Sequence, residues 1–299
     1  MTLRCSAVAR AGGEPLAGTA PHARAWVALE QPGPWGPQAL TSSHLDAAVG
    51  AALVQRTAGL PVTVVLIRRP GRHADHRLPG PRTVLVAHSG PASSWLERGT
   101  IEDPAVLLDL DLVALADGAR AGLGPLEAEP VLLVCTNSRR DTCCALHGRP
   151  AVDELAAARP GRVWESSHLG GHRFAPTVLS LPDGFVYGGP RAATLGLGAC
   201  RGRSALPPPA QAAELAVLLA LGSAPRPLTV EDAGPGRLVV HDAGHAWPVR
   251  VHTEALASRP ESCGKPPVPG LTHRAVVDGG PSRATPRPER HAQDRQPGG

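Results

Sequence analysis

The stretch of sequence that decides the fold contains two motifs, VLLVCTNSRRDTCCALHGRP at Val131 to Pro150 and WESSHLGGHRFAPTVLSLPDGFVYG at Trp164 to Gly188. Its first five residues, VLLVC, are apolar and short, which predicts a buried strand. The segment from Thr142 to about Ala158 predicts a helix with an interruption at Pro150. Arg162 to Glu165 predicts a further short strand. This half of the chain therefore begins β-α-β.

The rest of this region completes a recognisable order of elements. Thr177 to Leu181 and Phe185 to Tyr187 predict a hairpin across Pro182-Asp183-Gly184, a strong turn signal. Pro207 to Pro209 then open a helix over Ala210 to Leu221, and Gly222 ends it. The order is β-α-β, loop, β-β-α, that of a thioredoxin-like domain. In such a domain a site lies where the first strand runs into the first helix.

The residues before this region also predict α/β structure. Ala25 to Leu29 indicates a strand. A helix follows whose apolar residues include Leu45 and Leu53; Ser42 or Ser43 is its expected cap, and Gly59-Leu60-Pro61 stops it. Two β-branched runs, Pro61 to Ile67 and Thr83 to Val86, suit buried strands.

The predicted fold class is therefore α/β, with two α/β halves that could be related folds and a disordered tail. An N-terminal α/β domain is expected over residues 1–125, with Gly124 to Pro130 as a linker. A thioredoxin-like, ferredoxin-type domain follows over 131–256. The C-terminal segment 257–299 is rich in Gly and Pro, and we expect it to be mostly disordered beyond residue 269.

Composition excludes several classes of protein. The chain has 299 residues, a hydrophobic fraction of 42% and a net charge of +4 from 30 basic and 26 acidic residues. Lys265 is the only lysine, and the arginines are scattered among acids, so no nucleic-acid partner is expected. The longest apolar run, Leu215 to Leu221, is far short of the ~20 residues that span a bilayer. No membrane helix is expected.

Cysteine usage bears on location and chemistry. The first 18 residues lack the pattern of a secretory signal, which predicts a cytoplasmic protein. Six cysteines in a chain of this length, without a signal, favour free thiols or metal ligands over a disulfide framework.

The residues that carry chemistry lie beside the predicted strand ends. Cys135 ends the first strand of the second half, and Cys144 follows after the polar loop Thr136 to Asp141. His168 and His172 form an HxxxH pair, and Gly170-Gly171 between them favours a loop over a helix. Two cysteines and two histidines make a four-ligand set.

That ligand set fits two cofactors. Zinc takes four such ligands tetrahedrally. A [2Fe-2S] cluster with two cysteines on one iron and two histidines on the other has a Rieske-like composition and a raised potential. Zinc-finger cysteines are usually two to four residues apart, and the wider spacing of Cys135 and Cys144 favours the cluster.

The same motifs resemble the sucrase/ferredoxin-like family, whose members contain a thioredoxin-like ferredoxin domain. The resemblance extends to the opening segment from Cys5 to Gly36, to RGRSALPPPAQAAELA at Arg201 to Ala216, and to RPESCGK at Arg259 to Lys265. It implies a [2Fe-2S] cluster held by Cys135, Cys144, His168 and His172. A sucrase activity is not carried over, because the sequence offers no convincing pair of carboxylates for glycoside cleavage.

Other cysteines and histidines have plainer interpretations. Cys143 is the rival of Cys144, and the family spacing favours Cys144, with Cys143 as a packing residue. Cys5, Cys200 and Cys263 have no partner at ligand spacing and are expected to be buried thiols. A second HxxxH pair in HDAGH, His241 and His245, has no cysteine close in sequence and is expected to bind no metal.

The sequence therefore predicts an electron-transfer protein with one [2Fe-2S] cluster, a redox carrier more than a catalyst. Imidazole gains or loses a proton near neutral pH, so reduction could be coupled to proton uptake. Arg139, Arg140 and Arg173 flank the ligands and could dock an acidic redox partner. The chain has no Rossmann or P-loop motif, so a reductase or acceptor is expected to be a separate protein.

Two alternatives stay open: a zinc-binding structural module, and a thioredoxin-like enzyme of thiol-disulfide chemistry. The second lacks the CxxC pair typical of such enzymes. The sequence does not identify the oligomeric state.

Overall fold

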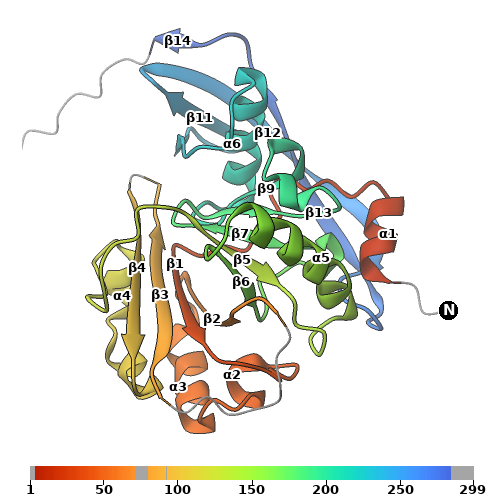
Figure 1. The fold of residues 1–299 in the computed structure, drawn as a ribbon. Coiled ribbons are helices and arrows are strands. Elements are labelled where there is room, and N and C mark those ends of the chain that lie inside the picture. Colours follow the sequence, from red (N-terminus) through yellow and green to blue (C-terminus); the bar gives the residue numbers. More distant parts are fainter. Residues whose placement is uncertain (1–3, 72–79, 92, 284–299) are drawn as a thin grey trace, which may run out of the picture.

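The structure is a computed structural model that describes residues 4–71, 80–91 and 93–283. It is a mixed α/β fold built on two sheets (Figure 1). The larger sheet has nine strands in the order β4-β3-β1-β2-β6-β5-β7-β8-β9. Its strands are β1 (Ala25–Glu30), β2 (Val62–Arg68), β3 (Arg82–Ser89), β4 (Ser94–Ile101), β5 (Val131–Cys135), β6 (Val163–Ser166), β7 (Val178–Leu181), β8 (Phe185–Tyr187) and β9 (Cys200–Arg203).

Helices connect these strands and cover the sheet. The α-helices are α1 (Cys5–Ala11), α2 (Ala39–Ser42), α3 (Ala47–Thr57), α4 (Leu112–Ala116), α5 (Thr142–Ala158) and α6 (Pro208–Leu221). Short 3-10 helices are η1 (Pro104–Asp109), η2 (His172–Phe174), η3 (Ala192–Thr194) and η4 (Leu197–Ala199). No helix within the described ranges is long and apolar enough to cross a membrane.

The two halves of the large sheet repeat one topology. In the first half, β1 pairs parallel with β2 and antiparallel with β3, and β3 pairs antiparallel with β4. In the second half, β5 pairs parallel with β6 and antiparallel with β7, and β7 pairs antiparallel with β8. A helix joins each parallel pair, α3 in the first half and α5 in the second. The halves are therefore related folds, each with the β-α-β-β-β order of a thioredoxin-like unit.

Strands β2 and β6 join the halves edge to edge. They pair antiparallel, with Ile67 opposite Ser166 and Arg68 opposite Glu165. The Arg68 and Glu165 side chains also form an ion pair at 2.6 Å. The predicted domain boundaries stay a prediction, although this pairing makes one sheet of both halves.

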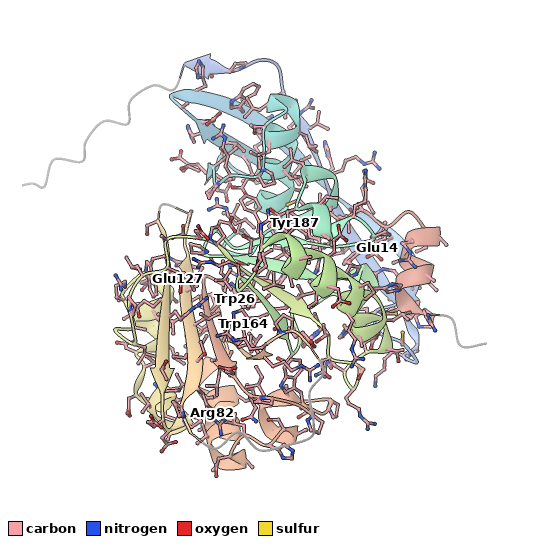
Figure 2. The ribbon with its side chains drawn as sticks, viewed as in Figure 1. Glu14, Trp26, Arg82, Glu127, Trp164 and Tyr187 are labelled. Carbon is pink, nitrogen blue, oxygen red and sulfur yellow. The ribbon has the colours of Figure 1, made fainter. Side chains whose placement is uncertain are left out.

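One face of the large sheet forms an apolar cluster with residues from both halves. Trp26 from β1 and Trp164 from β6, labelled in Figure 2, are both fully buried in it. Alternate residues of a strand point to the same face, so the residues of a strand that belong to the cluster are every second one along it. Cys135 and Cys144 belong to this cluster. Two of the four predicted ligands are therefore part of the apolar core.

A smaller antiparallel sheet follows α6. Its strands are β10 (Thr229–Asp232), β11 (Arg237–Asp242), β12 (His245–Pro260), β13 (Pro267–Val277) and β14 (Ser282–Arg283), in the order β10-β11-β12-β13 with β14 on β12. Apolar residues of α6 pack against it, among them Leu215 and Leu218. The long β12–β13 hairpin reaches back to α1 (Figure 1). The N-terminal helix thus meets the turn of the β12–β13 hairpin.

Within the segment expected to be mostly disordered beyond residue 269, residues 270–283 include most of β13 and all of β14, and residues 284–299 lie outside the described ranges. Two further expectations from the sequence are wrong in detail. Helix α5 continues through Pro150. Pro150 is exposed, so water can reach the carbonyl of the preceding turn that loses its partner. Helix α3 is capped by Asp46, and not by Ser42 or Ser43.

Candidate metal centre

Cys135 and Cys144 lie at the two ends of the loop that joins β5 to α5. Cys135 is the last residue of β5, and its thiol donates a hydrogen bond to the Ser167 carbonyl at 2.9 Å. Cys144 lies in the first turn of α5, where its backbone N–H donates to the Asp141 carbonyl at 3.1 Å. Each residue is 2% exposed. The strand end and the helix start therefore bring both thiols to one buried place.

The polar loop between the two cysteines is folded by its own side chains. Asn137 accepts hydrogen bonds from the backbone N–H groups of Arg139 and Arg140 at 3.1 and 3.3 Å. Its amide nitrogen donates to the Gly36 carbonyl in the first half at 3.0 Å. Asn137 thus shapes the loop, as the turn chemistry of asparagine predicts, and also fastens it to the other half.

His168 and His172 come from the loop after β6. Their rings stack with centroids 4.2 Å apart and an interplanar angle of 14°. The Nδ1 atom of His172 lies 3.4 Å from the Cys144 sulfur. The Nδ1 atom of His168 is buried and has no hydrogen-bond partner among the described residues. Because buried polar atoms are normally paired, an unpartnered imidazole nitrogen beside two thiols suits a metal ligand.

Two glycines and an arginine fix the path of this loop. Gly170 and Gly171 have φ of 79° and 73°, a region that favours glycine, which confirms the predicted loop between the histidines. Arg201 from β9 is fully buried, and it donates to the Gly170 carbonyl at 3.0 Å and to the Thr19 hydroxyl at 3.1 Å. Burial lowers the pKa of Arg201 to about 9, so its guanidinium is charged at neutral pH.

Burial and close contact shift the pKa values of Cys135, Cys144 and His172. A hydrogen bond with Cys144 lowers the pKa of Cys135, and the nearby imidazole of His168 adds to this effect. The same contact, together with burial, raises the pKa of Cys144. Burial, followed by the neighbouring His168, lowers the pKa of His172 to about 4. The imidazole of His172 is therefore neutral at neutral pH, the form that binds metals.

A solvent-accessible pocket of about 720 Å³ opens beside His172. Its wall includes three cationic side chains, Arg140, Arg173 and Lys265, and one acidic side chain, Glu261. His172 lines this pocket and His168 is half-buried, whereas Cys135 and Cys144 are each 2% exposed. The pocket gives a route to the site from one side.

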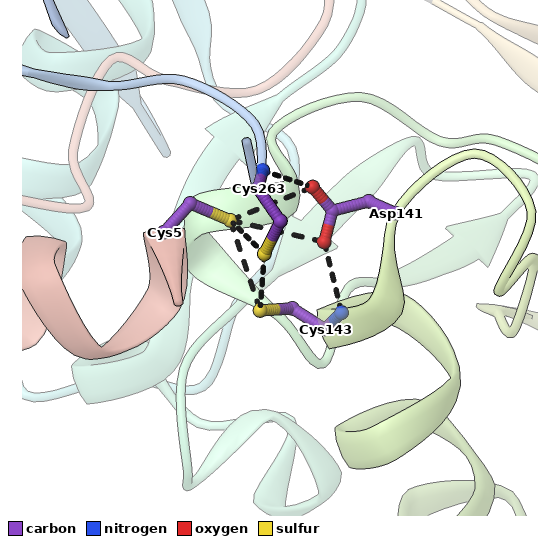
Figure 3. A group of neighbouring side chains, drawn as sticks. All are labelled: Cys5, Asp141, Cys143 and Cys263. Carbon is purple, nitrogen blue, oxygen red and sulfur yellow. Dashed lines mark hydrogen bonds between the residues drawn. The ribbon is translucent and has the colours of Figure 1, made fainter. Parts of the chain in front are cut away.

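A second group of cysteines lies on the other side of the α5 N-terminus (Figure 3). It consists of Cys5, Cys143, Cys263 and Asp141, whose ligand atoms all lie within 4.8 Å of one another. No other set of three or more histidine, cysteine or acidic side chains in the described ranges is as compact. This group could hold a metal ion.

Sequence spacing did not reveal this group. Cys5 and Cys143 are 138 residues apart, and Cys143 and Cys263 are 120 residues apart. Cys5, Cys143 and Cys263 are free cysteines, and Cys143 packs against Cys5 and Ala175, as expected, although Cys263 is only half-buried. The sequence did not indicate that the three thiols lie together. Adjacent residues of a helix point in different directions, so Cys143 faces this group and Cys144 faces His172. The contact with His172 favours Cys144 over Cys143 in the predicted ligand set.

Comparison with known proteins gives one result. The family model for sucrase/ferredoxin-like proteins matches residues 16–196, which cover β1 to η3 and include all four predicted ligands. No curated protein and no solved structure matches the chain. The family match spans more than half of the sequence, and the chain belongs to the sucrase/ferredoxin-like family.

Proposed function

We propose that this protein transfers electrons through one [2Fe-2S] cluster bound by Cys135, Cys144, His168 and His172. The observation that carries the proposal is the meeting of these side chains from β5, α5 and the loop after β6, with the His168 Nδ1 atom buried and unpartnered. Two thiols and two imidazoles are the ligands of a cluster in which two cysteines bind one iron and two histidines bind the other.

The spread of the four side chains favours a cluster over a single zinc ion. They do not form a compact group of the kind that Cys5 and its neighbours form. One zinc ion needs all its ligands at roughly 2.0–2.3 Å, whereas the ligands of a cluster are divided between two metal atoms. When bound, such a cluster accepts and releases one electron.

The surrounding residues have separate tasks in this proposal. Cys135 and Cys144 hold the buried side, where the apolar cluster excludes water. His168 and His172 hold the side nearer solvent. The cationic wall of the adjacent pocket would attract the acidic surface of a separate reductase or acceptor. An imidazole that binds iron through one ring nitrogen can exchange a proton at the other, so electron uptake would be accompanied by proton uptake.

Spectroscopy and metal analysis of anaerobically purified protein test the proposal. We expect about two irons per chain, visible charge-transfer absorption, and an EPR signal after reduction. His168→Ala and His172→Ala should lose or alter the absorption and abolish the pH dependence of the potential. His245→Ala, which alters the exposed member of the second HxxxH pair, is the matched control and should leave the iron content, the absorption and the pH dependence of the potential unchanged. Colourless, iron-free protein after cluster reconstitution would refute the proposal.

A further inference from the structure

A second metal centre is favoured by the arrangement of three sulfur atoms from distant parts of the chain. The Cys5 sulfur lies 3.7 Å from that of Cys143 and 3.6 Å from that of Cys263, and the third separation is 3.4 Å. Zinc–sulfur bonds of about 2.3 Å place two ligands of a tetrahedral ion about 3.8 Å apart. A disulfide would need about 2 Å. The three thiols are thus spaced as ligands of one ion.

Asp141 supplies a fourth vertex. Its Oδ2 atom lies 3.6 Å from the Cys5 sulfur, close to the sulfur–oxygen separation of about 3.5 Å that follows from zinc bonds of 2.3 and 2.0 Å. Asp141 is 4% exposed and forms no ion pair with an arginine or lysine in the described ranges. A buried carboxylate without a cationic side chain is costly, and a metal cation would compensate it.

Neighbouring hydrogen bonds hold these donors in place. Oδ1 of Asp141 accepts from the Cys143 backbone N–H at 2.8 Å, and Oδ2 accepts from the Cys263 N–H at 2.7 Å and the Ser262 hydroxyl at 2.8 Å. The Ser6 hydroxyl donates to the Cys143 sulfur at 3.2 Å. Metal ligands are typically oriented by such outer contacts, which also offset the negative charge of three thiolates and a carboxylate.

We propose that Cys5, Cys143, Cys263 and Asp141 bind one structural zinc ion that fastens α1 and the β12–β13 turn to the N-terminus of α5. Four protein ligands close the coordination shell, which is typical of a structural zinc site and leaves no position for substrate. The ion would link residues 258 positions apart, and closing so long a loop stabilises the folded state. The proposal does not depend on the cluster at Cys135.

The proposed zinc site would also stabilise part of the pocket wall beside His172. Glu261, Ser262 and Lys265 belong to the β12–β13 turn and line the pocket there. Because Cys263 lies in the same turn, zinc would hold this wall in place. Glu14 binds Arg173 at 2.8 Å and Arg259 at 2.7 Å. These ion pairs keep the same segments together, so a variant without zinc is expected to fold.

Zinc content of purified variants tests the proposal in the full chain. Protein from zinc-supplemented medium should hold about one zinc per chain, and Cys263→Ser should lose it while keeping its visible absorption. Cys200→Ser, which alters a buried cysteine outside both groups, is the matched control and should keep zinc. Cys135→Ser should lose visible absorption and keep zinc, so failure of the cluster proposal and failure of this one are distinguishable.

Cobalt(II) gives an independent readout. Titrated into reduced, zinc-depleted Cys135→Ser protein, it should give the thiolate charge-transfer and tetrahedral d–d bands that Cys135→Ser/Cys263→Ser lacks. Glutamyl endopeptidase should cleave after Glu261 faster in Cys263→Ser than in the wild type. Three results would overturn the proposal: zinc retained by Cys263→Ser, iron in place of zinc, or a disulfide among the three cysteines in metal-free protein.

Discussion

The two halves of the large sheet share a topology but have different residues where the first strand leads into the helix of each β-α-β unit. In each half a strand ends, a loop follows, and an aspartate caps the helix of the β-α-β unit: Asp46 in the first half and Asp141 in the second. Three residues beyond the cap stand Val49 and Cys144, respectively. Asp46 caps a helix at the surface, whereas Asp141 is buried beside two cysteine groups. The shared topology is therefore not sufficient to form the site, which depends on the residues at the N-terminus of α5.

The largest expected difference is between a buried ion pair of the second half and an exposed ion pair of the first. Arg203 and Glu214 form an ion pair at 2.7 Å with side chains 0% and 1% exposed. Removing Arg203 by substitution with Met should lower the free energy of unfolding by about 3–5 kcal/mol, because Glu214 is left buried and uncompensated. Arg24→Ala breaks a largely exposed ion pair with Asp117. This substitution should change the free energy of unfolding by less than about 1 kcal/mol.

Urea unfolding of both variants measures this difference. Arg203→Met/Glu214→Leu should regain part of the loss, because no lone charge then stays buried. If Arg203→Met and Arg24→Ala lowered the free energy of unfolding equally, burial of the Arg203–Glu214 pair would not increase its contribution to stability.

Glycine substitutions test the loops of the two halves. Gly59 and Gly171 both have positive φ, and an alanine there costs about 1–2 kcal/mol in backbone strain. A β-carbon at Gly59 meets nothing within 4 Å, whereas at Gly171 it would overlap the Arg201 guanidinium. Gly171→Ala should therefore destabilise the protein by about 2–4 kcal/mol in total and lower its iron content. Gly59→Ala should leave iron content unchanged.

Thermal unfolding and iron analysis of these two variants check the expectation. An unchanged iron content in Gly171→Ala would show that the loop between the histidines does not position them.

The smallest expected effect concerns the helix cap of the first half. Asp46 accepts hydrogen bonds from the backbone N–H groups of Ala48 and Val49 at 2.8 and 3.0 Å. Asp46→Ala should cost about 1 kcal/mol, and Asp46→Asn close to nothing, since asparagine caps equally well. Neither should change metal content. A loss of metal in Asp46→Ala would mean that the halves are coupled more tightly than the comparison implies.

Local patterns predicted most of the second half. The apolar run VLLVC, the Pro182-Asp183-Gly184 turn and the Gly222 helix end each depend on neighbouring residues, and β5, the β7–β8 hairpin and α6 all form. The four predicted ligands are near each other in sequence, and the structure brings them together. Whether they bind a cluster stays a prediction.

Features that depend on distant residues escaped prediction. Strand β9, CRGR, contains two arginines yet is buried throughout, because partners elsewhere in the chain bind Arg201 and Arg203. Strand β13 pairs with β12 and contacts α6, so its structure depends on residues outside its own segment. The group of Cys5, Cys143 and Cys263 combines residues that are more than 100 positions apart in sequence, and no sequence spacing could have linked them.

The meeting of α1 with the β12–β13 turn has a consequence for synthesis. All four residues of the predicted cluster site have left the ribosome before residue 263 is made, since a chain emerges from its N-terminus and domains generally fold in that order. Cys5, although among the first residues translated, must wait for nearly the whole chain before its partners are complete. A ribosome-bound chain stalled shortly after residue 222 would therefore present Cys5 and Cys143 without their third thiol, leaving the N-terminal helix to dock last.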